Sequence, residues 1–108
     1  MTATFSTAAS EDLRKIGAWT YEIWGENQLE VYEGHLVNLV EAINSDPLSP
    51  MSHVAIEGVS DVRGRHIRSI FRRGRHVAYY RLTKSGVHIL RVLHDQMLAA
   101  HHLTGFEE

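Results

Sequence analysis

Two segments in the N-terminal half have apolar residues at three- and four-residue spacing, which is typical of amphipathic helices. The first extends from Ser6 to Trp24, and its apolar side comprises Leu13, Ile16, Thr20 and Ile23. Ser6 suits the N-cap because its hydroxyl can accept a hydrogen bond from an amide of the first turn. Gly25 is expected to end this helix.

The second segment extends from about Asn27 to Asn44. Its apolar side comprises Tyr32, Leu36, Leu39, Val40 and Ile43, and its carboxylates, Glu26, Glu30, Glu33 and Glu41, lie largely on the other side. The helix is expected to end before Pro47, which lacks an amide donor and restricts the preceding residue. Because few residues separate the two segments, we expect an antiparallel helical hairpin.

The C-terminal half has the pattern of strands rather than helices. Three strand-like runs cover about residues 65–72, 75–82 and 87–94, with turns at "RRG" and "TKSG". A short strand, "TATFS", is expected to open the chain, and the amphipathic tail "DQMLAAHHL" is expected to form a short C-terminal helix. Residues 46–62 contain both prolines and show no sustained period, so we expect a long connecting loop there.

This order of elements, β-α-α-β-β-β, predicts an α+β fold in a single domain over residues 1–108. The helical hairpin is expected to pack on a small, mainly antiparallel sheet of three to four strands. A chain of 108 residues is long enough for one modest core and no more.

Both faces of the predicted sheet carry large apolar residues. In the middle strand Ala78, Tyr80 and Leu82 share one face, and Val77, Tyr79 and Arg81 share the other. In the final strand, Val87, Ile89 and Leu93 are expected on one face, and Leu90 and Val92 are expected on the other. One hairpin covers one face, so the other is expected to expose apolar surface rimmed by arginine for a partner. The alternative is that the tail, through Met97, Leu98 and Leu103, covers it.

Charge is unevenly distributed along the chain. The net charge of −2 combines −8 over residues 1–62, +9 over residues 63–94 and −3 over the remainder. The segment "RGRHIRSIFRRGRHVAYYR" alone holds seven arginines and no carboxylate. This polarity predicts a basic face suited to an acidic partner. Alternatively, the acidic and basic halves neutralise each other within the domain.

Several classes of protein are disfavoured by composition. There are no cysteines, which excludes disulfides and thiolate metal sites, and no apolar run is long enough to span a membrane. The first residues lack the pattern of a signal peptide, so a cytoplasmic location is expected. None of the eight histidines lies in a ligand frame with carboxylates, so we expect no metal and no cofactor.

Four pieces of the chain resemble the ParE branch of the RelE/ParE toxin superfamily: "DLRKIGAWTYEIWGENQ", "VRGRHIRSIF", "GRHVAYYRLTKSGVHILRVLH" and "HHL". The resemblance implies the toxin of a type II toxin–antitoxin module, neutralised by a ParD-like antitoxin whose C-terminal segment wraps the toxin. ParE-type toxins inhibit DNA gyrase, whereas RelE-type relatives cleave mRNA on the ribosome. ParE-like tails commonly read Met-Asp where this chain has Met97 and Leu98, which bears on toxicity.

The ribonuclease alternative can be weighed on four positions. The basic groups of that branch correspond to Arg68, Ile70, Val77 and Asp95 here, and the tail has no tyrosine. A carboxylate repels the charge that develops on the phosphate, so this set argues against an enzyme. His94, His101 and His102 are alternative acid–base groups, since histidine titrates near neutral pH.

A protein partner therefore fits the basic strands better than nucleic acid does. The chain is acidic overall, so direct specific binding of nucleic acid is not expected, whereas arginines form strong hydrogen bonds to carboxylates. Trp19 and Trp24 either pack the hairpin on the sheet, or Trp24 is an exposed anchor for a partner. The predicted partner-binding residues are Trp24, Arg65, Arg68, Val77, Tyr79, Arg81 and His94.

Overall fold

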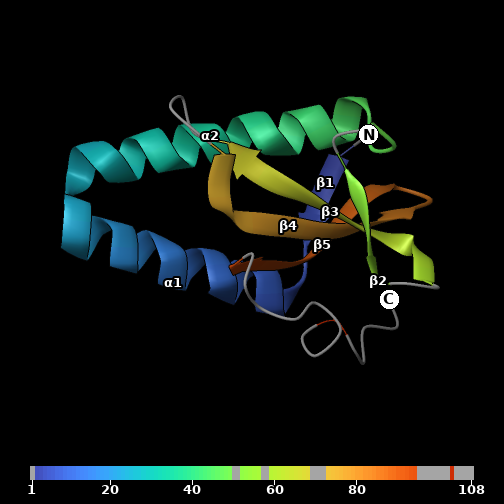
Figure 1. The fold of residues 1–108 in the computed structure, drawn as a ribbon, viewed down its shortest axis with the longest axis horizontal. Coiled ribbons are helices and arrows are strands. Elements are labelled where there is room, and N and C mark those ends of the chain that lie inside the picture. Colours follow the sequence, from blue (N-terminus) through green and yellow to red (C-terminus); the bar gives the residue numbers. More distant parts are fainter. Residues whose placement is uncertain (1, 50–51, 57–58, 69–72, 95–102, 104–108) are drawn as a thin grey trace.

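The computed structural model describes residues 2–49, 52–56, 59–68, 73–94 and 103, and it has the predicted α+β class. The elements are β1 (Thr2–Phe5), α1 (Thr7–Trp24), α2 (Glu26–Ser45), β2 (His53–Ile56), β3 (Val59–Arg68), β4 (Arg73–Thr83) and β5 (Gly86–His94). The two helices form an antiparallel pair that lies on one side of the sheet (Figure 1). At the blue-cyan end this pair extends beyond the strands.

The boundaries of α1 agree with the prediction. Ser6 has an extended backbone, and its hydroxyl accepts a hydrogen bond from the Ala9 amide at 2.9 Å. Gly25 has a φ of 87°, a left-handed conformation that glycine adopts without steric cost, and its amide donates to the Tyr21 carbonyl at 2.8 Å. Because α2 begins at the next residue, Gly25 alone turns the chain from one helix to the other.

The sheet has five strands in the order β1-β5-β4-β3-β2. β1 runs parallel to β5, and the other pairs are antiparallel. The sheet is therefore mixed, and it is larger than the three to four strands predicted.

The prediction of a loop over residues 46–62 is wrong for its second half. β2 pairs with β3, with His53 opposite Gly64 and Ile56 opposite Val59. A four-residue strand such as β2 shows too few alternations to be recognised, and it is held by antiparallel pairing with β3, the next strand along the chain. At the next turn, Arg73 already belongs to β4, so the strand begins inside "RRG". The turn predicted at "TKSG" is confirmed, with Lys84 and Ser85 between β4 and β5.

β5 contains a bulge that changes which residues share a face. Tyr80 lies opposite Ile89 and Tyr79 opposite Arg91, so Leu90 has no opposing residue. An extra residue of this kind reverses the alternation beyond it. The predicted assignment is therefore wrong for two residues: Val92 joins Val87 and Ile89 beneath the helices, and Leu93 joins Leu90 on the opposite face.

The two faces of the sheet carry separate hydrophobic clusters. Beneath the helices, the inner cluster is Ala9, Leu39, Ile43, Ala78, Tyr80, Val87, Ile89 and Val92. On the opposite face, which we call the outer face, the cluster is Val62, Val77, Tyr79, Leu90, Leu93 and Leu103. None of these six is more than 6% exposed, so the expectation of an exposed apolar face is wrong for them. Leu103 comes from the tail, while Met97 and Leu98 lie outside the described residues.

Candidate functional site

The predicted partner-binding residues are divided among three parts of the molecule. Residues directly opposite each other on neighbouring strands share a face. Arg81 is opposite Val62, which places it on the outer face with Val77 and Tyr79. Both apolar members of this group are buried, with exposures of 2% and 5%.

Arg65 and His94 lie on the other side of the sheet. Arg65 is opposite Ala78, an inner-cluster residue, and His94 is opposite His76 at the end of β5. The His76 and His94 rings form an edge-to-face pair with centroids 5.8 Å apart. Arg68 is opposite Arg73, after an irregularity in the register of β3. The predicted set is therefore not one continuous surface.

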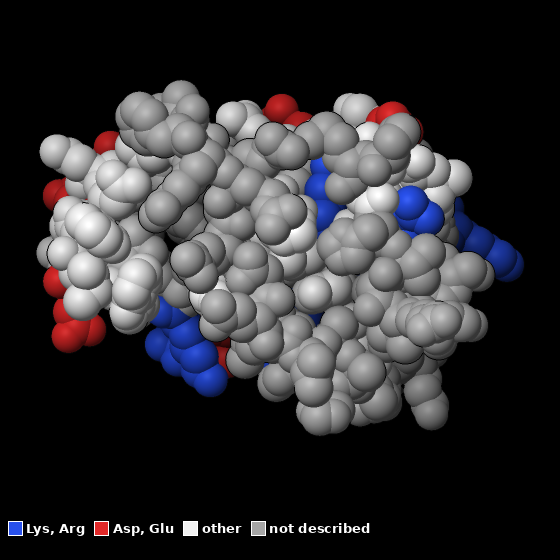
Figure 2. Space-filling view, viewed as in Figure 1, with Lys and Arg blue, Asp and Glu red and all other residues white. Residues whose placement is uncertain are grey.

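Surface charge follows the division seen along the chain. Acidic side chains lie around the helical hairpin, at the left and top of the view in Figure 2, and basic side chains lie over the strands at right. A further basic group lies beside α1. Acidic and basic side chains are therefore concentrated on different elements, but they are not confined to opposite ends of this face.

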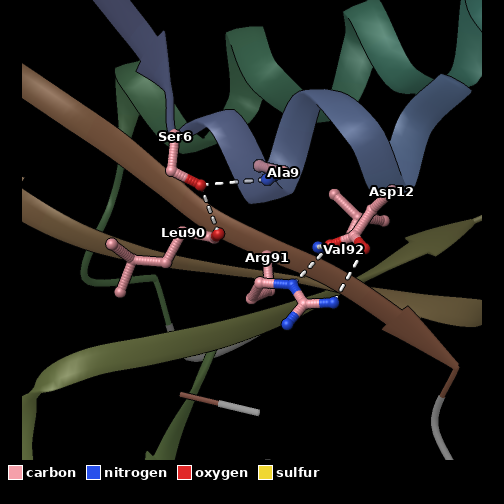
Figure 3. Close-up of polar contacts among 6 residues, drawn as sticks. All are labelled: Ser6, Ala9, Asp12, Leu90, Arg91 and Val92. Carbon is pink, nitrogen blue, oxygen red and sulfur yellow. Dashed lines mark hydrogen bonds and ion pairs between the residues drawn. The ribbon is translucent and has the colours of Figure 1, made fainter. Parts of the chain in front are cut away.

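Arg91 has a structural role that removes it from the free basic surface. Its guanidinium donates to Asp12 of α1 through Nε at 2.7 Å and through NH2 at 2.9 Å, and the Val92 amide donates to the same carboxylate at 3.0 Å (Figure 3). The bond to Asp12 raises the pKa of Arg91 above its ordinary value. One acidic residue of the helices thus neutralises one basic residue of the strands.

Asp12 and Ser6 together satisfy the edge of β5 beyond the end of β1. The Ser6 amide donates to the Ile89 carbonyl at 2.9 Å, and its hydroxyl donates to the Leu90 carbonyl at 2.6 Å (Figure 3). Further along β5, the carboxylate of Asp12 accepts a hydrogen bond from the Val92 amide. These contacts anchor the start of α1 to the bulged part of β5 and close that edge to an additional strand.

Arg63 is also used within the fold. Its guanidinium donates to the Ser52 hydroxyl at 2.9 Å and to the Ser52 carbonyl at 3.4 Å. On the same face, the Tyr80 hydroxyl donates to the Pro47 carbonyl at 2.5 Å. These bonds hold the segment after α2 against the sheet, so the basic stretch is partly structural.

Val77, one of the four positions that are basic in the ribonuclease branch, is apolar and enclosed here. Val77 is 2% exposed and belongs to the outer cluster with Tyr79, Leu90 and Leu103. Of the other positions weighed from the sequence, Ile70 and Asp95 lie outside the described residues. Within the described part of the chain, no group of three or more histidine and carboxylate side chains could hold a metal ion.

In the part of the chain that the structure describes, the end of α1 carries a group of large exposed apolar side chains. Trp19, Tyr21, Ile23 and Trp24 are 55%, 57%, 55% and 65% exposed. The alternative in which both tryptophans pack on the sheet is therefore wrong. The prediction that Ile23 lies on the core-facing side of the helix is also wrong. The physical reason is that this end of the hairpin extends beyond the strands (Figure 1).

A groove lies between the two helices near the same end. Its volume is about 500 Å³, and its lining includes Leu13, Gly17, Tyr21, Leu29, Tyr32 and Leu36. The Tyr32 hydroxyl is buried here and has no hydrogen-bond partner among the described residues. Burial raises the pKa of Tyr32 to about 12. Sequence reasoning missed this groove, because its residues have the spacing of an ordinary helix–helix contact.

Comparison with known proteins assigns this arrangement to a family. Residues 3–99 match the model of the ParE toxin of the type II toxin–antitoxin system parDE. No curated protein sequence matches the chain. In the described residues, neither helix has a stretch long and apolar enough to cross a membrane.

Two solved structures share the fold. One is of a chromosomal ParDE toxin–antitoxin system from P. aeruginosa, with a TM-score of 0.68 and 18% identity over 87% of this chain and 95% of the other. The second is of the toxin–antitoxin complex RelBE2 from Mycobacterium tuberculosis, with a TM-score of 0.55 and 23% identity over 86% of this chain and 95% of the other.

Proposed function

The chain belongs to the ParE toxin family of type II toxin–antitoxin systems, and on this premise we propose that it inhibits DNA gyrase. We further propose that a ParD-like antitoxin neutralises it in the cytoplasm. In this proposal the toxin acts by binding gyrase and not by catalysing a reaction.

The enclosed apolar outer face is the observation that carries this choice over a ribonuclease. RNA cleavage needs groups that move protons and stabilise a developing oxyanion beside the scissile phosphate. Val77 occupies one such position with a buried aliphatic side chain, packed with Tyr79, Leu90 and Leu103. A phosphate placed there would lose its hydration without gaining a charged partner.

The antitoxin partner is expected to carry carboxylates together with apolar anchors. Exposed ion pairs contribute only about 0–1 kcal/mol each, so affinity must come mainly from apolar contacts. Among the described residues, Trp24 is the most exposed large apolar residue, at 65%, and it is the strongest candidate anchor. Arg81, at the end of the outer face, would orient the partner and increase the association rate.

A paired assay tests the target. Purified chain is added to a gyrase supercoiling reaction and, separately, to ribosomes translating a defined mRNA. We expect loss of supercoiling and intact mRNA. Cleaved mRNA with unaffected supercoiling would support the ribonuclease instead, and activity in neither assay would indicate a member that has lost toxicity.

Antitoxin binding is tested on the anchor residue. Trp24→Ser should weaken binding to the cognate antitoxin by at least about tenfold, because a truncated anchor typically costs more than about 1.4 kcal/mol. Val37→Ser is the control, since Val37 is an exposed apolar residue of α2, at 54%. Equal affinities of the two variants would remove Trp24 from the interface. Calorimetric titration measures both.

A further inference from the structure

Four exposed residues form a continuous strip along one side of α1, away from the groove between the helices. Lys15, Trp19, Glu22 and Ile23 are spaced so that they share one side of the helix. We call this strip the α1 stripe. Trp19 and Ile23 are each 55% exposed, so the stripe combines two large exposed apolar side chains with one cation, Lys15, and one anion, Glu22.

Within the described residues, the charges of the stripe form no ion pair, and Lys15 acts on the Glu11 carboxylate only at longer range. Arg14, the neighbouring cation, donates to Glu11, whereas Lys15 and Glu22 form no ion pair with any residue in the described ranges. The apolar part lies towards the end of the hairpin that extends past the strands (Figure 1). The sheet therefore leaves one side of this part of α1 uncovered.

A small hollow adjoins the stripe. It has a volume of about 170 Å³ and is lined by Lys15, Ile16, Trp19 and His76. Ile23 lies two turns further along the same helix. The stripe thus has an apolar projection at one end and an apolar hollow at the other.

We propose that the α1 stripe is a self-association surface, on which a second copy of this chain docks with its α1 antiparallel. With a two-fold axis near Trp19, Ile23 of each copy enters the hollow beside Lys15 of the other. The two Trp19 side chains then meet at the centre. A surface must complement itself in this way to form a two-fold interface.

Charge complementarity favours a second copy over an acidic segment. In the antiparallel arrangement, Lys15 of each copy lies next to Glu22 of the other, so two ion pairs form around the apolar centre. An acidic peptide on the same surface would meet Glu22 and the carboxylate of Glu26 at the start of α2. Because the stripe has one cation and one anion, two copies in antiparallel orientation bring opposite charges together.

The area indicates a weak, concentration-dependent dimer. A buried aromatic residue contributes about 150–250 Å², and two half-exposed residues per copy supply on the order of 200 Å². Stable interfaces bury about 800 Å² per partner. We therefore expect a dissociation constant in the high micromolar to millimolar range, with affinity falling as salt screens the ion pairs.

This inference is independent of the gyrase proposal, because it concerns only the free chain. Analytical ultracentrifugation of the free chain over a hundredfold concentration range should show reversible dimer formation. Lys15→Glu and Glu22→Lys should each weaken it by about tenfold, since each replaces two attractive contacts with repulsive ones. The dimer dissociation constant of the double variant should return to within about threefold of that of the parent chain.

Ile23→Ser supplies a second test that does not depend on charge. It should weaken association by at least tenfold, whereas Val37→Ser, on an exposed position of α2 outside the stripe, should leave it unchanged. Circular dichroism verifies that every variant is folded. A chain that is monomeric at all concentrations, or a double charge variant that is no better than the single ones, would overturn the proposal.

Discussion

The outer face of the sheet and the free end of the helical hairpin carry similar apolar side chains but differ in exposure. On the outer face, Leu90 is fully buried and Val77 is 2% exposed, whereas Trp24 and Trp19 of the hairpin are 65% and 55% exposed. The sheet residues lie in a cluster that includes Leu103 from the tail. The end of the hairpin that carries the hairpin residues extends beyond the strands (Figure 1).

This difference separates apolar residues that stabilise the fold from those available to partners. A buried side chain contributes to stability through removal of its surface from water and through dispersion contacts. An exposed one contributes little until another molecule covers it, and clusters of exposed apolar residues mark interaction sites. Substitutions in the two regions should therefore have opposite consequences for stability and for binding.

The largest effect is expected from truncating the outer cluster. Leu90→Ala should reduce the free energy of unfolding by about 2–5 kcal/mol, because it removes a fully buried side chain and leaves a cavity. Leu48→Ala is the matched control at a position that is 63% exposed, and it should change stability by less than about 0.5 kcal/mol. Urea unfolding measures both. Similar small losses would mean that the outer face is open in solution.

An intermediate effect is expected where the helices and strands are joined by charge. Asp12→Ala leaves the Arg91 guanidinium and the Val92 amide without their acceptor. Both side chains of the pair are mostly buried, with exposures of 21% and 12%. We expect a loss of about 2–3 kcal/mol, measured by thermal or urea unfolding.

Glu11→Ala is the control for that substitution. Glu11 precedes Asp12 on the same helix and pairs with Arg14 at the surface, so its removal should leave the unfolding midpoint unchanged. If both variants had the same midpoint, the link between α1 and β5 would not contribute to stability.

The smallest effect is expected in the groove of the hairpin. Tyr32→Phe removes a buried hydroxyl that bonds to no described residue, so stability at pH 7 should change by less than about 1 kcal/mol or increase slightly.

At alkaline pH the same variant should differ from the parent chain. Because the folded-state pKa of Tyr32 is raised from 10.0 to about 12, the parent chain holds this proton more tightly when folded. Ionisation of Tyr32 therefore leaves the stability of the parent chain unchanged below pH 10 and lowers it as the pH rises from 10 towards 12. Tyr32→Phe should therefore lose less stability over this interval, as measured by urea unfolding at each pH. If the stability of both chains changed equally with pH, the Tyr32 hydroxyl would be exposed to water and not buried.

Local features of the chain were predictable because short-range contacts determine them. The N-cap at Ser6, the break at Gly25 and the turn at Lys84 and Ser85 each depend on a few neighbouring residues. The helical period marked both helices, and the alternation of β4 assigned Tyr79 and Tyr80 to the correct faces. The α+β class follows from the order of these elements.

The candidate site was less predictable, because it depends on contacts between distant parts of the chain. The sequence alone determined which residues are apolar or charged and which segments are helical. Only the tertiary structure decided that Leu90 bulges and that Arg91 is bound by Asp12. It also decided that the outer face is buried while the hairpin end is exposed. The physical reason is that burial depends on what lies opposite a side chain, and strand pairing brings together residues that no local pattern connects.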